Sequence, residues 1–295
     1  MITLMFAAGL LLVAILLVSE LFHGSAPARE KLNFFHFLTA TTWNPVLDEF
    51  GALPFLYGTV VTSFLALLFS IPLGVGAAIF LSELAPAKIS NALTFVIELL
   101  AAIPSVIYGM LAIFTVVPLL RNDVDPALKS VLGFTPIFSG HIWGVGYLAA
   151  GVVLAIMAIP FIISVSRESL LAVPREQREA ALALGATRWE TTWQIVVPYA
   201  KLGIVGSIFL ALARALGETM AVTMVIGNDP KIHASLFAPG YSIASVIANE
   251  FAEATSKVHA AALVELGLVL FLLTVVINAG ARLMIIATTK KGSKR

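Results

Sequence analysis

The sequence contains no cysteine and very little charge. Without cysteine the 295 residues form no disulfide and carry no thiol chemistry, and nothing in them indicates a redox compartment. Aspartate, glutamate, lysine and arginine make up only 12% of the chain, against about a quarter in an ordinary soluble domain. The formal net charge is +1, which gives no electrostatic reason to expect a nucleic-acid partner.

The chain also lacks the features of an enzyme. No G-x-x-x-x-G-K-[ST] loop occurs in it, so we expect no ATP site and no cofactor bound by this chain. We find no nucleophile and base at matched depth in the apolar stretches. The histidines have no metal-ligand spacing, so we predict no metal site and a surface position for each of them: His23, His36, His141, His233 and His259.

Long apolar runs are what the sequence has in excess. Hydrophobic residues make up 59% of the chain, and the mean hydropathy is +0.99. A helix that spans a bilayer needs about 20 mostly apolar residues, and six stretches meet this requirement. The first resembles a signal peptide, but it has no basic start and its apolar run is too long, so we expect it to be retained. The predicted spans are residues 2–22, 55–82, 92–120, 142–166, 199–226 and 261–287.

These spans predict an all-α membrane protein, a polytopic bundle of six transmembrane helices. Apart from Arg214, which falls deep inside a span, the lysines and arginines lie unequally on the two sides, eleven against six, and the richer side is expected to be cytoplasmic. Both termini then lie inside the cell. The predicted segments are a first transmembrane helix at 1–22, a periplasmic segment at 23–54, a core of five helices at 55–287 that contains a cytoplasmic loop at 167–200, and a basic cytoplasmic tail at 288–295.

The cytoplasmic loop, which we take as Arg167 to Lys201, is the longest charged run in the chain. Its pattern predicts two short helices with a sharp corner between them. Gly185 can take the left-handed conformation that closes the first helix. Thr187 and Glu190 have the spacing of a capping box that opens the second. We expect Pro198 to end this unit and the next span to begin there.

The spacing of this loop resembles the EAA loop of bacterial ABC importer permeases. Glu179, Ala180 and Ala181 are followed by Gly185 and then by Ile195–Pro198, with Val197 where the family has leucine. The resemblance implies the ABC importer type I permease fold. It also implies that the first helix of the loop docks on a cytoplasmic ATPase, with Gly185 as the elbow. An ordinary pair of amphipathic interfacial helices would give a similar pattern.

Two opposite charges stand inside the fifth predicted span. Arg214 and Glu218 are four residues apart, so a continuous helix would place them on one face about one turn apart. A charge at this depth costs about 2.5 kcal/mol or more, and such residues usually face a bundle interior or an aqueous cavity. Glu98 and Glu265 are further acids inside predicted spans. Charged groups in these positions indicate a path for a polar substrate.

The pair of charges favours one kind of substrate. Arginine presents a planar fork that suits an oxyanion. A carboxylate beside it repels fully ionised sulfate but accepts a hydrogen bond from the P–OH of phosphate, so Arg214 and Glu218 fit phosphate better. Two alternatives stay open. The pair can be a structural salt bridge, or Glu98, Glu218 and Glu265 can form the proton relay of an ion-coupled secondary transporter.

Several longer strings resemble phosphate importer permeases of the PstC type. The resemblance implies a permease subunit that moves inorganic phosphate across the bacterial inner membrane by alternating access, with Arg214 and Glu218 as the translocation pair. The partners it implies are a sister permease, two ATP-binding cassette subunits that hold ATP and magnesium, and a periplasmic phosphate-binding protein. Permeases for sulfate, molybdate or phosphonate share the loop and remain alternatives. The strings are FGALPFLYGTVVTS at 50–63, IELLAAIPSVIYGM at 97–110, RALGETMAVTMVIGN at 214–228, ANEFAEA at 248–254 and ALVELGLVLF at 262–271.

Overall fold

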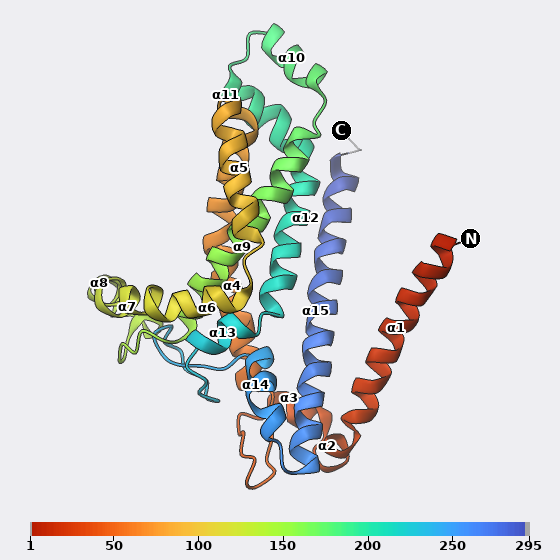
Figure 1. The fold of residues 1–295 in the computed structure, drawn as a ribbon, viewed down its shortest axis with the longest axis vertical. Helices are drawn as coiled ribbons and strands as arrows, with labels where there is room; N and C mark the ends of the chain where they lie inside the picture. Colours follow the sequence, from red (N-terminus) through yellow and green to blue (C-terminus); the bar gives the residue numbers. More distant parts are fainter. Residues whose placement is uncertain (1, 293–295) are drawn as a thin grey trace.

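The computed structural model describes residues 2–292, and within that range the chain is built from helices with no strand (Figure 1). Three π-helical segments lie at Phe80–Leu84, Leu120–Val124 and Thr192–Val196. The α-helices are α1 (Ile2–Gly24), α2 (Ala26–Lys31), α3 (Phe34–Thr39), α4 (Leu53–Ile79), α5 (Ala87–Ala101), α6 (Ser105–Phe114), α7 (Val116–Leu119), α8 (Asp125–Leu132), α9 (Tyr147–Leu171), α10 (Arg175–Ala183), α11 (Arg188–Thr191), α12 (Val197–Leu216), α13 (Met220–Val225), α14 (Ile243–Glu250) and α15 (Lys257–Gly292).

Six helical stretches in the described part of the chain are long and apolar enough to cross a membrane, which agrees with the number predicted. They do not all coincide with the predicted ranges. The helical stretches are Thr3–Gly24, Leu53–Leu84, Ser105–Leu132, Tyr147–Leu171, Arg188–Leu216 and Lys257–Gly280.

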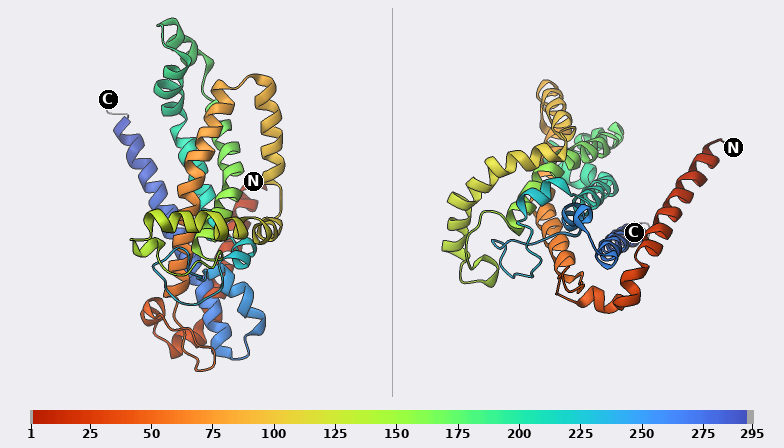
Figure 2. Two further views of the ribbon diagram at one scale, coloured as in Figure 1. Left: turned by 90° about the vertical axis from the view of Figure 1, so that its left-hand side faces the viewer. Right: turned by 60° about the horizontal axis from the view of Figure 1, so that its bottom comes forward.

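Helices α4, α9 and α12 run side by side and form the centre of the bundle (Figures 1 and 2). Small residues allow this close packing: a Cβ at Gly151 would meet Leu65, and one at Gly203 would meet Ser169. The hydroxyls of Ser166 and Ser207 lie 2.7 Å apart and join α9 to α12. A bilayer supplies no hydrophobic drive between helices, so close contacts and buried hydrogen bonds of this kind hold the bundle together.

The predicted third span, 92–120, is wrong as one continuous helix. Helix α5 ends at Ala101 and α6 begins at Ser105. Helices α6 to α8 then run across the direction of the bundle instead of along it (Figure 2). Pro104 explains the corner, because proline has no N–H to donate and disfavours helical geometry in the residue before it. The helix that follows continues to Leu132, through much of what was expected to be a loop.

Helix α1 stands apart from the bundle and meets it mainly along α15 (Figure 1). Its apolar side chains are largely exposed, as expected of a helix that faces lipid.

The segment after α1 packs against the start of α15, and the position of His259 there contradicts one prediction. His259 is only 5% exposed, its Nε2 lies 3.0 Å from Glu250 and its ring stacks on Phe50. It is therefore a core residue, unlike the surface histidine that its position suggested.

The two ends of the bundle carry different elements. We call the end that carries α10 and α11 the loop end, and the end that carries α2, α3 and α14 the opposite end (Figure 1). Helix α14 packs into the core through Ile243 and Val246, both fully buried. The predicted basic tail, 288–295, is helical as far as Gly292, while residues 293–295 lie outside the described residues.

Candidate functional site

The corner between α10 and α11 has the geometry that its sequence predicts. Gly185 has a φ of +88°, in the left-handed region. Its N–H donates to the carbonyl of Leu182 at 3.0 Å, and the N–H of Ala186 donates to the carbonyl of Ala181 at 3.2 Å. These two bonds make a Schellman motif, which satisfies the last carbonyls of α10 and turns the chain sharply.

The capping box at the start of α11 is also confirmed. The Thr187 hydroxyl accepts from the N–H of Glu190 at 3.2 Å, and the Glu190 carboxylate accepts from the N–H of Thr187 at 2.8 Å. The prediction that Pro198 ends this unit is wrong. The chain passes from α11 through the π-helical segment Thr192–Val196 directly into α12. Proline has no N–H to donate, so one carbonyl in the preceding turn loses its usual partner. A π-helical turn changes the hydrogen-bond pattern at this point, and the helix continues past Pro198.

Helix α10 presents an open surface at the loop end (Figure 1). Glu179 and Ala180 are exposed, Ala181 is partly exposed, and no residue of the helix is buried. The side chain of Leu184, directly after the helix, is 90% exposed. Small and apolar residues on an uncovered helix are the composition expected of a docking surface for another protein.

The predicted geometry of Arg214 and Glu218 is wrong in one respect. Helix α12 ends at Leu216, so the two residues do not share a helix. Arg214 lies in the last turn of α12, where a cation is favoured by the negative helix end. Glu218 lies in the link before α13, and its Oε1 accepts from the N–H of Ala221 at 3.3 Å. A break of this kind in a membrane-spanning helix is tolerated where the backbone is buried in protein or lines an aqueous cavity.

The broken helix still brings the two charges to one place. Arg214 and Glu218 line a small hollow together with Ala211 and Ala215 of α12 and with residues of α9. The hollow measures about 10 Å³, about the volume that one water molecule needs. Arg214 is exposed and Glu218 half-buried. Among the side chains that the structure describes, no ion pair involves either residue, which speaks against a plain structural salt bridge.

The other acids of the predicted spans lie in different environments. Glu98 is exposed on α5. Glu265 on α15 is fully buried, and neither of its oxygens has a hydrogen-bond partner. In the described part of the chain no hydrogen bond joins Glu98, Glu218 or Glu265 to another of the three. The structure therefore shows no connected carboxyl relay.

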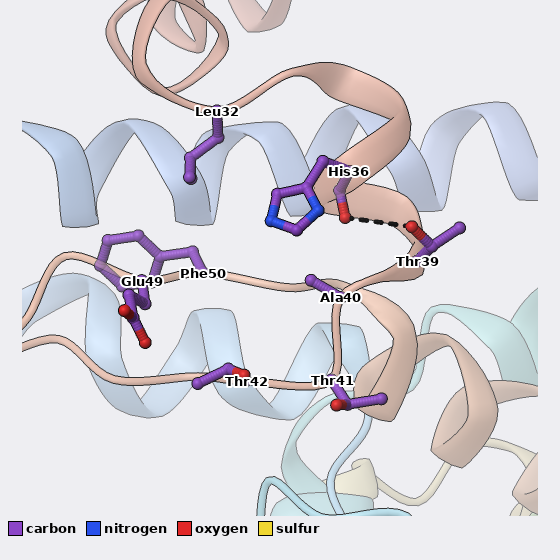
Figure 3. Close-up of a pocket in the computed structure, with 8 residues that line it drawn as sticks. All are labelled: Leu32, His36, Thr39, Ala40, Thr41, Thr42, Glu49 and Phe50. Atoms are coloured by element: carbon purple, nitrogen blue, oxygen red, sulfur yellow. Dashed lines mark hydrogen bonds between the residues drawn. The ribbon is translucent and has the colours of Figure 1, made fainter.

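A polar pocket at the opposite end does not contain the predicted residues. It measures about 430 Å³, and Figure 3 shows the His36 ring and the Glu49 carboxylate on its walls, with the Thr39 hydroxyl bonded to the backbone carbonyl of His36. No lysine or arginine lines it, and the Glu49 carboxylate would repel an anion. The full lining is Leu32, His36, Thr39, Ala40, Thr41, Thr42, Glu49 and Phe50. The pocket is consequently a poor oxyanion site.

Comparison with known proteins identifies the family. Residues 70–285 match the family described as binding-protein-dependent transport system inner membrane component. The chain is 47% identical over 98% of its length to a Pasteurella multocida protein, covering 91% of it, and 45% identical over 95% of its length to a Mesorhizobium japonicum protein, covering 87% of it. Both relatives are named phosphate transport system permease protein PstC.

Solved structures agree on the fold. A bacterial alginate ABC transporter, in complex with an alginate-bound periplasmic protein, matches with a TM-score of 0.66 at 16% identity and covers 98% of this chain and 95% of its own. The MetNI methionine ABC transporter matches with a TM-score of 0.57 at 18% identity and covers 83% of this chain and 99% of its own. The chain thus belongs to the binding-protein-dependent transport system inner membrane components, and within them to the phosphate transport system permeases of the PstC type.

Proposed function

We propose that this chain forms one wall of a path for inorganic phosphate and that Arg214 contacts the anion as the permease alternates between its two faces. The observation that carries the proposal is the position of Arg214 at the end of a broken helix, exposed on this chain and without an ion pair among the described side chains. A guanidinium left uncovered at this depth needs either water or another surface. The sister permease would supply the second wall.

The size of the hollow supports a shared site. A volume of about 10 Å³ is too small for an oxyanion, so this chain alone does not enclose one. A second permease facing Arg214 would complete the cavity. Glu218 would then accept a hydrogen bond from the protonated oxygen of phosphate, which sulfate lacks near neutral pH.

The energy for transport would come from other subunits. Two ATP-binding cassette subunits holding ATP and magnesium would dock on α10 at the loop end, and a periplasmic phosphate-binding protein would deliver the anion at the opposite end. The open helix with Glu179 and Ala180, and the elbow at Gly185, supports this assignment. In this arrangement the chain itself binds no nucleotide.

Reconstitution tests the proposal. The chain should co-purify in detergent with a second permease and an ATPase. In proteoliposomes the complex should take up radiolabelled phosphate only with ATP and binding protein, and neither sulfate nor molybdate should compete. Phosphate uptake by this chain alone, without ATP, would replace the proposal with ion-coupled transport.

Labelling tests the orientation, in which the loop end and both termini lie in the cytoplasm. The natural chain has no cysteine, so each introduced thiol reports without background. Leu184 and Val46 are each 90% exposed, at the loop end and the opposite end respectively. Leu184→Cys should react with an impermeant maleimide only in inverted vesicles, and Val46→Cys only in intact spheroplasts. The reverse pattern would contradict the assigned orientation.

A further inference from the structure

One arginine of α10 reaches back to the bundle. Nη2 of Arg178 donates to Oε1 of Glu83 at 2.9 Å, and its Nε donates to Oε2 at 3.2 Å. The same guanidinium donates to the carbonyl of Leu170 at 2.8 Å and to the carbonyl of Val173. Arg178 therefore contacts two separate parts of the bundle at once: the π-helical end of α4 and the end of α9.

The geometry of this contact sets it apart from an ordinary surface ion pair. The two carboxylate oxygens of Glu83 accept from two nitrogens of Arg178, the paired arrangement that is both stronger and more directional. The Arg178 and Glu83 side chains are only 20% and 9% exposed. The carbonyls of Leu170 and Val173 belong to a helix end and the turn after it, where a cation supplies the missing donors.

Helix α10 has few other attachments. None of its residues is buried, and among the described side chains only Arg178 makes hydrogen bonds that join it to the bundle. Glu179, the next residue and the first of the EAA motif, lines a hollow of about 370 Å³ together with Arg178 and Glu83. The surface assigned to the ATPase is thus next to the attachment point.

We propose that Arg178 and Glu83 form a latch that makes α10, α4 and α9 move as one unit when an ATPase moves α10. The proposal rests on the function proposed above, because it presumes that an ATPase docks on α10. Arg178 is a positioning residue in this scheme: it touches neither phosphate nor ATP. Without the latch, α10 would shift on the ATPase while α4 and α9 lag behind, and ATP would be hydrolysed without transport.

The readout that separates a latch from a mere stabilising contact is the ratio of phosphate transported to ATP hydrolysed. It is measured in proteoliposomes on complexes that contain equal amounts of all subunits. A contact that only stabilises the fold changes the yield of complex but leaves this ratio unaltered in the complexes that form. We expect Arg178→Gln and Glu83→Gln each to lower the ratio about fivefold.

Matched variants complete the test. The double variant should transport no less phosphate per ATP than the more impaired of the two single variants, because both changes remove the same bond. Arg178→Lys should give an intermediate ratio of phosphate transported to ATP hydrolysed, because lysine keeps the charge but lacks the planar guanidinium that binds both carboxylate oxygens. Lys88→Gln removes an exposed charge that has no bond in the described structure. Lys88 lies at the start of α5, five residues after Glu83, and its replacement should leave the ratio unchanged.

Three results would overturn the latch: a normal ratio in both single variants, additive losses in the double variant, or an equal loss in Lys88→Gln. If Arg178→Gln fails to assemble, Glu83→Gln decides alone, because it is isosteric and leaves the α9 contacts of Arg178 intact. A wild-type complex without ATP-dependent phosphate uptake would instead refute the function on which the latch rests. The two failures are therefore distinguishable.

Discussion

Replacing Arg214 by Gln is expected to lower phosphate uptake by the assembled transporter about thirtyfold or more, with the subunits still co-purifying. The loss of a charged partner from a desolvated ionic contact costs about 2 kcal/mol or more, which is about thirtyfold in rate or affinity. In this chain Arg214 is exposed and pairs with no carboxylate whose side chain the structure describes, so its removal leaves no buried carboxylate behind. The effect should therefore fall on transport and spare folding. The measurement is initial phosphate uptake at saturating ATP.

Two companion variants make the result specific. Arg214→Lys keeps the positive charge but loses the planar guanidinium, so it should retain more phosphate uptake than Arg214→Gln. Glu218→Gln should lower phosphate uptake less than Arg214→Gln and should let sulfate compete, because the charge that repels sulfate is gone. Full phosphate uptake in both Arg214→Gln and Glu218→Gln would end the assignment of this pair to translocation.

Local chemistry explains which parts of the loop could be predicted. Gly185, Thr187 and Glu190 act through bonds to backbone groups no more than a few residues away, so their spacing alone determines the turn and the cap. The number of apolar stretches is equally local, because it depends only on length and composition. These features needed no knowledge of the rest of the fold.

The breaks in the spans could not be predicted in the same way. Both the third and fifth predicted spans are mostly apolar over their whole length, and hydropathy does not distinguish one straight helix from two helices at an angle. Pro104 and Gly217 were present as signals, but proline and glycine are common inside transmembrane helices and often leave them intact. The packing of α6 against α13, two segments far apart in the sequence, is visible only in the structure.

Contacts between residues far apart in the chain could not be predicted from the sequence either. Glu83 and Arg178 are 95 positions apart, and each looks like an ordinary solvated charge in its own segment. His259 likewise looks exposed until Phe50 and Glu250 are placed beside it. The residues proposed to bind phosphate and to dock a partner could be located from the sequence, whereas the contacts between distant segments required the structure.

Replacing Gly185 by Val is expected to uncouple ATP hydrolysis from phosphate uptake. A residue with a Cβ pays about 1–2 kcal/mol in the left-handed conformation that Gly185 adopts, and a β-branched residue is the least tolerated there. A Cβ at this position would meet nothing within 4 Å, so the cost is one of backbone strain and not of collision. The strain should open the Schellman bonds from Gly185 and Ala186 and change the angle between α10 and α11. The measurement is phosphate transported per ATP hydrolysed.

Gly185→Asn is the control that isolates the backbone conformation. Asparagine is larger than alanine but visits the left-handed region readily, and open space surrounds the position. It should therefore keep the coupling that Gly185→Val loses, even though both variants add a side chain to the surface where an ATPase would dock. Equal coupling in wild type, Asn and Val would show that the elbow transmits no motion. Equal loss in Asn and Val would show that the docking surface, and not the turn, requires glycine. Only the graded result supports a rigid left-handed corner as the joint between motor and membrane helices.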